Sequence, residues 1–287
     1  MPDLALLLLT LLWGSTFTLV KGSLEIASPG VFLALRFSLA AAALGLVALW
    51  RRDKVGPGFW RDGLWLGLFM LAGFALQTFG LRFTTPARSG FFTGLSVLFV
   101  PFIARFTLRR PVTVSAWGGV ALAVVGVALL SRPFGDAAGP DVLLGDLLTL
   151  GCAVAYALQV AFTSEWSARH PLVPFTLLQV AVVLAGSLLL IPLEGARLDA
   201  GRWPELAGTV AFTGLLMTAG AFFVMNWAQR HTSAVRAALI YALEPASAAT
   251  FSWLLIGEQL GPLGWIGGAL IVLGVVAGEV GGAFERR

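Results

Sequence analysis

The residues of this sequence that could do chemistry are polar side chains inside long apolar stretches. Glu244 is the one acid that lies well inside such a stretch. A carboxyl group in that position could exchange a proton for a substrate, or it could bind an ammonium group. It could instead be structural, because Pro245 follows it, and a proline kinks a helix and frees a backbone carbonyl. The sequence leaves both roles open for Glu244.

Further polar and aromatic side chains recur at helical spacing along six of the apolar stretches, which places each set on one face of a helix. Apolar walls remove a small amphipathic molecule from water, and a few polar groups orient it, so such faces predict a binding cavity. Hydrogen bonds between helices, worth about 0.6–2 kcal/mol each, are the alternative explanation. The candidate substrate-binding residues are Trp13, Thr16, Phe74, Gln77, Phe92, Thr93, Tyr156, Gln159, Met225, Asn226 and Tyr241.

A smaller group of charged residues is expected near one membrane surface. Arg36 lies close to the start of an apolar stretch, where its long side chain can reach the interface. Lys21 and Glu258 are expected on the same side. These three residues are therefore the candidates for an outer gate, formed by ion pairs, and not for direct contact with a substrate.

The composition excludes most soluble functions. Of 287 residues, 58% are apolar and only 12% are charged, against about 25% charged in soluble domains. The net charge of +4 is dispersed over short loops, which argues against nucleic-acid binding. A single cysteine, Cys152, and two distant histidines, His170 and His231, predict neither disulfides nor a metal site. No phosphate-binding loop or nucleophile–base set is found, so we expect neither an enzyme nor a cofactor.

The apolar stretches are long enough to cross a membrane. A spanning helix needs about 20 apolar residues. Lys and Arg in the loops number twelve on the side of the N-terminus and six on the other, so the positive-inside rule places both termini in the cytoplasm. The chain is predicted to be an all-α integral membrane protein with ten transmembrane helices. They are expected near 4–21, 30–50, 63–81, 88–107, 115–131, 143–163, 172–191, 206–228, 235–256 and 262–280.

The sequence also resembles itself. When the first half of the chain is aligned with the second, Trp13 matches Tyr156 at an offset of about 143 residues. Later in the alignment the offset becomes 148 residues. The repeat predicts two units, residues 1–135 and 140–287, of five helices each. Because five is odd, the second unit enters the membrane from the opposite side, an arrangement common among secondary transporters. At the offset of 148 the matching pairs are Arg82/Arg230, Thr84/Thr232, Arg88/Arg236, Trp117/Trp265, Gly119/Gly267 and Gly126/Gly274.

Several motifs together resemble the EamA-type proteins of the drug/metabolite transporter superfamily, over essentially the whole chain. The resemblance implies a ten-helix metabolite exporter of the bacterial inner membrane, with the amino-acid exporters as the most similar subgroup. Ser96-Val97 stands where the second unit has Glu244-Pro245, so the two units are not equivalent. The motifs are Trp13-Gly14-Ser15-Thr16-Phe17, Lys21, Arg36-Phe37, Thr232-Ser233-Ala234, Leu243-Glu244-Pro245, Gly257-Glu258, Gly267-Gly268-Ala269 and Gly274.

The sequence thus predicts a secondary transporter that exports small amphipathic metabolites by alternating access, with aromatic or neutral amino acids as the favoured substrates. An exporter of cationic drugs is one alternative, although the first helix lacks an acid beyond Asp3. A passive channel or lipid scramblase is the alternative from a different class. Apart from the substrate and the lipid bilayer no partner is expected. The chain is expected to be a monomer, and a homodimer could form through glycine pairs such as Gly264/Gly268 and Gly274/Gly278.

Overall fold

The structure is a computed structural model that describes residues 1–131, 140–256 and 261–284. Within these ranges the chain is helical, apart from its turns and one isolated bridge between Ala27 and Leu198. The elements before residue 132 are α1 (Pro2–Gly14), α2 (Thr16–Ile26), α3 (Pro29–Arg51), α4 (Phe59–Phe83), α5 (Pro86–Gly94), α6 (Ser96–Phe102), the π-helix η1 (Ile103–Thr107) and α7 (Val114–Ser131).

The remaining elements include two short 3₁₀-helices and a second π-helix. They are α8 (Pro140–Trp166), η2 (Ser167–Arg169), α9 (Leu172–Glu194), η3 (Ala200–Arg202), α10 (Trp203–Ala211), the π-helix η4 (Phe212–Gly220), α11 (Ala221–Gln229), α12 (Ala234–Tyr241), α13 (Glu244–Ile256) and α14 (Pro262–Phe284).

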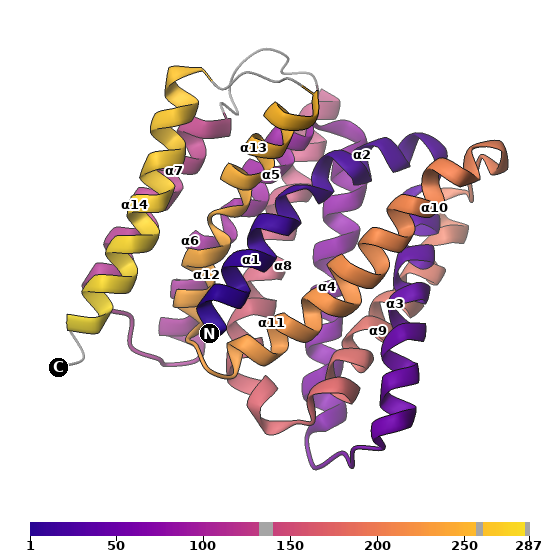
Figure 1. Ribbon diagram of the computed structural model, residues 1–287, viewed down its shortest axis with the longest axis horizontal. Coiled ribbons are helices and arrows are strands. Elements are labelled where there is room, and N and C mark those ends of the chain that lie inside the picture. The colour runs from indigo at the N-terminus through magenta and orange to yellow at the C-terminus, as the bar shows by residue number, and fades with distance from the viewer. Residues whose placement is uncertain (132–139, 257–260, 285–287) are drawn as a thin grey trace.

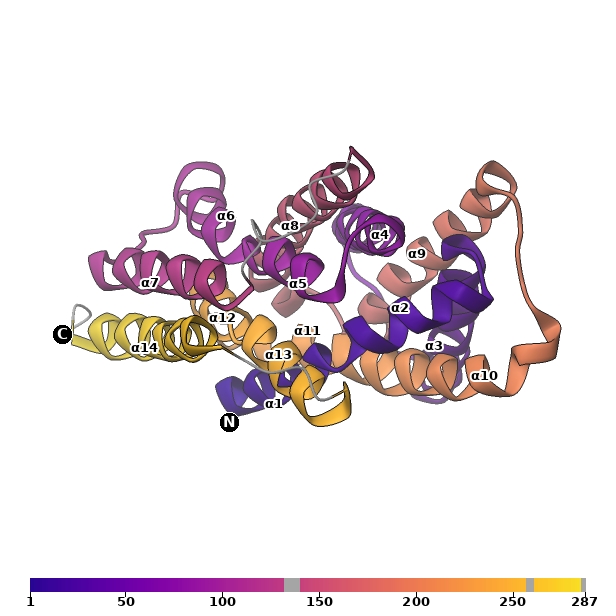
Figure 2. The ribbon, with the colours of Figure 1, turned by 90° about the horizontal axis from the view of Figure 1, so that it is seen from above.

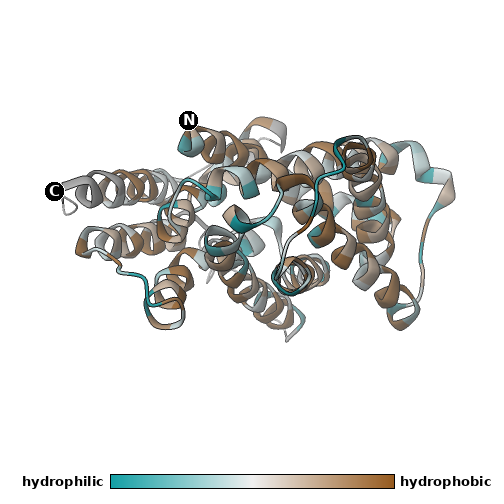
Figure 3. Cartoon of the chain, turned by 90° about the horizontal axis from the view of Figure 1, so that it is seen from below, coloured by the Kyte–Doolittle hydropathy of each residue, from teal (hydrophilic) through white to brown (hydrophobic). Residues whose placement is uncertain are grey.

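Seven helical segments of the described chain are long and apolar enough to cross a membrane: Pro2–Ile26, Pro29–Arg51, Phe59–Phe83, Arg88–Thr107, Asp141–Arg169, Leu172–Glu194 and Ala200–Gln229. Shorter apolar helices cover Val114–Leu129 and Pro262–Gly278. Hydrophobic residues follow the helices, and hydrophilic residues gather on several connections (Figure 3). The prediction of an all-helical protein of the membrane type is confirmed. The number of ten spans and the inverted relation of the two units stay predictions.

The helices pack into one elongated bundle (Figures 1 and 2). Seen from above, α7 and α14 form one edge, and α3, α9 and α10 form the other, with α1, α8, α11 and α12 between them. In Figure 1, α1 begins and α14 ends at the lower end of the bundle, whereas the chain enters α5 and α8 at the upper end. The start of α1 and the end of α14 therefore lie towards the same end of the bundle.

Three helices are interrupted part-way along their length. The breaks fall at Ser15 between α1 and α2, at Leu95 between α5 and α6, and at Ala242 between α12 and α13. The backbone ψ angle is −21°, −9° and −14° at these residues, against about −42° in a regular α-helix. Pro245 accounts for the third break, because it has no N–H and its ring would clash with the carbonyl of Tyr241.

At one edge of the bundle, α7 and α14 contact each other through glycines. A Cβ atom built on Gly119 would lie 2.5 Å from the carbonyl oxygen of Gly274, and one on Gly126 would lie 2.6 Å from that of Gly267. No side chain fits at such distances, so the two backbones touch directly. The glycines that sequence analysis singled out on α14 thus serve, at these positions, contacts within the chain.

A cavity at the helix breaks

The three helix breaks surround a cavity in the middle of the bundle. Its empty volume, which includes space open to solvent, is about 750 Å³. Each break lies between two lining residues that are three positions apart in the sequence: Trp13 and Thr16, Thr93 and Ser96, and Tyr241 and Glu244. The lining residues are Trp13, Thr16, Phe17, Val20, Arg36, Phe74, Gln77, Thr78, Leu81, Thr93, Ser96, Tyr156, Gln159, Val160, Phe222, Met225, Tyr241 and Glu244.

The breaks themselves are in contact, which fixes the walls of the cavity relative to one another. Gly94, the last residue of α5, packs against the ring of Pro245, because a Cβ on Gly94 would lie 2.8 Å from the proline Cγ. At the first break, a Cβ on Gly14 would lie 2.6 Å from the Ser247 hydroxyl oxygen. That hydroxyl donates a hydrogen bond of 2.6 Å to the carbonyl oxygen of Leu11. The start of α13 therefore joins all three interrupted helices.

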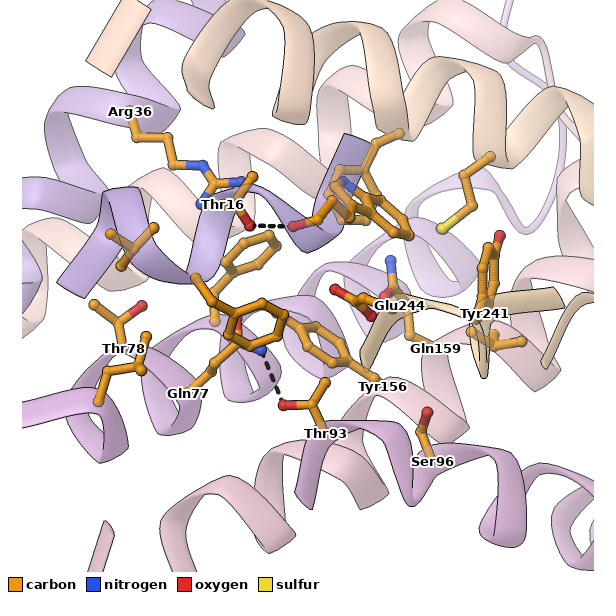
Figure 4. A pocket seen from close by; sticks show the side chains of 18 residues that line it. Thr16, Arg36, Gln77, Thr78, Thr93, Ser96, Tyr156, Gln159, Tyr241 and Glu244 are labelled. Atoms are coloured by element: carbon orange, nitrogen blue, oxygen red, sulfur yellow. Dashed lines mark hydrogen bonds between the residues drawn. The ribbon is translucent and has the colours of Figure 1, made fainter. Parts of the chain in front are cut away.

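One wall of the cavity is aromatic. The ring of Trp13 lies 5.7 Å from the rings of both Phe222 and Tyr241, and Phe74 meets the ring of Tyr156 edge-on at 5.7 Å. The Trp13 indole N–H donates to the carbonyl oxygen of Met217 over 3.3 Å, which holds the indole in this position. Gln77 donates to the hydroxyl of Thr93 over 3.1 Å (Figure 4). The wall offers apolar faces with a few polar groups at fixed positions.

Arg36 brings a positive charge into the cavity. Its side chain, in a residue only 4% exposed, donates from Nε to the Thr218 hydroxyl over 2.8 Å and lies 4.7 Å from the centre of the Phe74 ring. No carboxylate of the described chain forms an ion pair with it. A buried cation without a counter-charge is costly in a membrane, and a site that contains one is suited to an anionic group.

An acidic side chain and two unsatisfied polar groups lie elsewhere on the same lining. Glu244 is at the first position of α13 and lies beside Gln159 and Tyr241 in Figure 4, whereas Arg36 is drawn near Thr16. The Tyr241 hydroxyl and the Gln159 amide nitrogen are buried and have no hydrogen-bond partner in the described part of the chain. Such orphaned groups are unfavourable unless a ligand or water meets them.

The structure brings together most of the residues that sequence analysis grouped. Of the eleven candidate substrate-binding residues, nine line the cavity: Trp13, Thr16, Phe74, Gln77, Thr93, Tyr156, Gln159, Met225 and Tyr241. Glu244 lines it as well. Residues outside that group also line the cavity. Most of them lie on the same helical faces as the candidates, so their helical spacing in the sequence could have identified them. They are Phe17, Val20, Thr78, Leu81, Ser96, Val160 and Phe222.

Two of the eleven candidates lie outside the lining. Asn226 is fully buried between helices, where its amide donates to the Phe222 carbonyl at 2.8 Å and accepts from Gln179 of α9 at 3.3 Å. Phe92 packs against Phe91, with ring centres 4.9 Å apart. The helical faces that carry Asn226 and Phe92 are wider than the part that borders the cavity. Neighbouring residues on these faces line the cavity, whereas Asn226 and Phe92 do not.

The three gate candidates are not brought together. Arg36 lines the cavity, and Lys21 donates to the backbone carbonyls of Leu81 and Thr84 at the end of α4. Glu258 lies outside the described residues. The sequence expectation for Arg36 rested on its nearness to the start of a helix. In the structure its side chain is buried against η4 and does not extend along the helix to the interface.

Comparison with known proteins places this architecture in a family. The sequence profile of the EamA-like transporter family matches residues 1–132 and 143–277. An uncharacterized transporter of Archaeoglobus fulgidus is 30% identical over 275 residues, covering 96% of this chain and 84% of the relative. The uncharacterized transporter YwfM of Bacillus subtilis is 28% identical, covering 96% and 92%. A solved crystal structure superposes with a TM-score of 0.78 at 19% identity, over 98% of each chain, which shows the shared fold.

Proposed function

The chain belongs to the EamA-like transporter family, and we propose that it exports neutral and aromatic amino acids by alternating access. It is a transporter and not an enzyme, as its family and the names of its relatives indicate. We place it in the bacterial inner membrane, with both termini in the cytoplasm, because Lys and Arg are twice as frequent in the loops on that side. The substrate would bind in the cavity at the helix breaks.

The observation that carries the choice of substrate is that an arginine and a glutamic acid line the same cavity. An amino acid carries a carboxylate and an ammonium group on the same carbon, next to a side chain of variable polarity. Arg36 offers a cation that no described carboxylate pairs with, and Glu244 offers an acid at the edge of a helix break. The carboxylate of a zwitterion would compensate the charge of Arg36, and its ammonium group would bind at Glu244. Its side chain would lie against Trp13 and Phe222, whose rings form the apolar wall.

The overall architecture proposed here is ten spanning helices in two inverted units. The two segments that the family profile matches, residues 1–132 and 143–277, agree with the units that the internal repeat predicts. The glycine contacts between α7 and α14 support the same division. Gly119 meets Gly274, and Gly126 meets Gly267. Since the repeat pairs Gly119 with Gly267 and Gly126 with Gly274, each contact is the counterpart of the other, as a two-fold axis requires.

The two alternative functions make different demands on the cavity. A cationic drug would benefit from Glu244 but would meet the uncompensated charge of Arg36 in the same space. A channel would need a continuous polar path, whereas the aromatic rings of Trp13, Phe74 and Phe222 contact one another across this site. Both observations favour an occluding carrier for a zwitterion.

The test is transport in proteoliposomes that are loaded separately with labelled phenylalanine, labelled threonine or a cationic dye, with and without a pH gradient. We expect saturable amino-acid movement that accelerates when unlabelled amino acid is present on the opposite side. Arg36→Gln and Glu244→Gln should abolish it, whereas Lys54→Gln, which removes an exposed charge far from the cavity, should not. Movement of the dye alone, or linear flux without exchange, would contradict the proposal. Transport that does not respond to the pH gradient would show only that Glu244 does not couple transport to protons.

A further inference from the structure

Two ion pairs in this structure occupy matching positions in the two units. Arg88 of α5 pairs with Asp146 of α8, and Arg236 of α12 pairs with Asp3 of α1 at 2.8 Å. The two arginines are 148 residues apart and the two aspartates 143, the same offsets that relate the two units elsewhere in the sequence. Each pair therefore connects one unit to the other, and each is the counterpart of the other pair.

The local structure around the two arginines is also the same. Thr85 and Ser233 precede α5 and α12, and the hydroxyl of each accepts a hydrogen bond of 3.3 Å from the backbone N–H of the arginine three residues later. Both arginines thus project from the first turn of a capped helix. Similar local geometry argues that the ion pairs form part of the duplicated unit and are not chance contacts at the surface.

The two pairs lie on opposite sides of the central cavity. α5 and α8 begin at the upper end of the bundle in Figure 1, and α1 and α12 begin at the lower end. The breaks that line the cavity lie between these ends, at Ser15, Leu95 and Ala242. Each ion pair consequently spans the two units at one of the two possible entrances to the site.

The pairs differ in how tightly they are formed. The side chains of Arg88 and Asp146 are 18% and 6% exposed, and Asp146 accepts a further hydrogen bond of 2.9 Å from the Thr84 hydroxyl. The side chains of Arg236 and Asp3 are 42% and 38% exposed. Buried ion pairs are less screened by solvent and salt than exposed ones, so the upper pair closes its side more firmly.

The lower side is also incompletely assembled. Thr232 is the counterpart of Thr84, yet its buried hydroxyl has no hydrogen-bond partner in the described ranges of the chain. Thr232 and Arg236 line a second hollow among residues of η1, α7, α8, α12 and α14, and its empty volume of about 1660 Å³ includes space open to solvent. At the upper side the backbones meet closely, because a Cβ on Gly80 would lie 2.9 Å from the carbonyl oxygen of Gly145. The structure is thus tight at the upper end and loose at the lower end.

We propose that Arg88–Asp146 and Arg236–Asp3 are the two alternate gates of the transporter, and that this structure has the Arg88–Asp146 gate closed. In the opposite state Asp146 would release Thr84 and Arg88, while Asp3 would accept from both Arg236 and Thr232, as Asp146 does here. The inference rests on the proposed alternating access, but it does not depend on which substrate is carried. A substrate is expected to enter and leave at the end of the bundle where the ion pair is open.

The test measures access to the cavity directly. Cys152 is replaced by serine, and Ser96, which lines the cavity, by cysteine as the labelling site. A membrane-impermeant maleimide is applied to reconstituted protein from either side. Asp146→Asn should raise the labelling rate from the upper side about tenfold, since a state populated at 0.1–10% leaves room for such a rise. Asp3→Asn should lower labelling from that same side, because it removes the contact that closes the opposite gate.

Two further variants separate a gate from a simple structural tie. Exchanging the charges, Arg88→Asp with Asp146→Arg, should restore the labelling pattern that Asp146→Asn disturbs. Thr232→Val removes a hydroxyl that makes no contact here, so it should leave the melting temperature unchanged but reduce labelling from the upper side. Its matched control is Thr84→Val, which should act in the opposite direction. Labelling that changes in the same direction for both aspartates, or an inert Thr232→Val, would overturn the proposal. Absence of amino-acid transport would leave it intact.

Discussion

Gly94 at the end of α5 lies directly against the ring of Pro245 near the start of α13, and this contact joins two of the three helix breaks. In the repeat, Gly94 corresponds to Ala242, and Ser96 corresponds to Glu244. If the chain consists of the two proposed units, these two breaks occupy equivalent positions in them and contact each other. Interrupted helices expose backbone groups and allow side chains on both flanks to reach one space, which makes such breaks common at the binding sites of transporters.

We predict that Gly94→Ala lowers both stability and transport. A methyl group there would lie 2.8 Å from Pro245 Cγ, so the two breaks must move apart. Gly90→Ala, one turn earlier on α5, is the matched control, because a Cβ on Gly90 meets nothing within 4 Å. Both changes gain about 1 kcal/mol of helix propensity, so the difference in melting temperature between them reports packing. Equal melting temperatures and equal transport rates would show that the contact is not required.

Tyr241→Phe separates binding from folding. The Tyr241 hydroxyl has no partner in the described chain, so its removal should leave the melting temperature unchanged or slightly raised. If the hydroxyl contacts the substrate, the loss of a hydrogen bond of about 1 kcal/mol raises the KM about fivefold. The measurement is the KM for phenylalanine efflux, compared with thermal unfolding in detergent. A lower melting temperature with an unchanged KM would mean that the hydroxyl has a structural partner.

Arg36→Lys tests what kind of contact the cation makes. Lysine keeps the charge but loses the planar group that stacks on Phe74 and donates to Thr218. We expect amino-acid transport to persist with a KM raised about tenfold or more, because charge compensation of a carboxylate remains while orientation is lost. Arg36→Gln should instead abolish transport. Equal kinetics for Arg36→Lys, Arg36→Gln and the unaltered chain would remove Arg36 from the site.

Asn226→Leu should change stability and leave the transport kinetics unchanged. Asn226 bonds to Gln179 and to the Phe222 carbonyl and does not line the cavity. Interhelical hydrogen bonds of this kind contribute about 0.6–2 kcal/mol, so the melting temperature should fall by a few degrees while the KM stays the same. Thermal unfolding and efflux kinetics on one preparation decide the point. A changed substrate preference would restore Asn226 to the binding site.

The sequence could predict the helices and most of the cavity because both depend on the 3.6-residue period. Its precision is limited by the width of a helical face. Residues are about 100° apart around a helix, so Asn226 is about 40° to one side of Phe222 and Met225 about 60° to the other. The cavity lies on the Phe222 and Met225 side, and α9 supplies Gln179 on the Asn226 side. Spacing within one helix does not show which neighbour takes each side.

The role of Arg36 could not be predicted, because it depends on a π-helix in a distant part of the chain. η4 brings the Thr218 hydroxyl within 2.8 Å of Arg36, and that hydroxyl itself donates to the Thr213 carbonyl five residues earlier. The wider turn has no recognisable pattern in the sequence. Depth along a helix indicates how far a side chain is from the interface, but it does not indicate whether the side chain points inward.

The α7–α14 contact yields the last prediction, which also bears on the oligomeric state. Gly126 of α7 touches the Gly267 carbonyl, whereas a Cβ on Gly118 or on Gly268 meets nothing within 4 Å. Gly126→Val should therefore separate the two helices and destabilise the chain strongly, while Gly118→Val should be tolerated. Since α14 uses Gly267 and Gly274 within the chain, we propose a monomer, and Gly268→Leu should not change the mass measured by light scattering in detergent. A dimer that Gly268→Leu converts to a monomer would instead assign the outward glycines of α14 to a second copy of the chain.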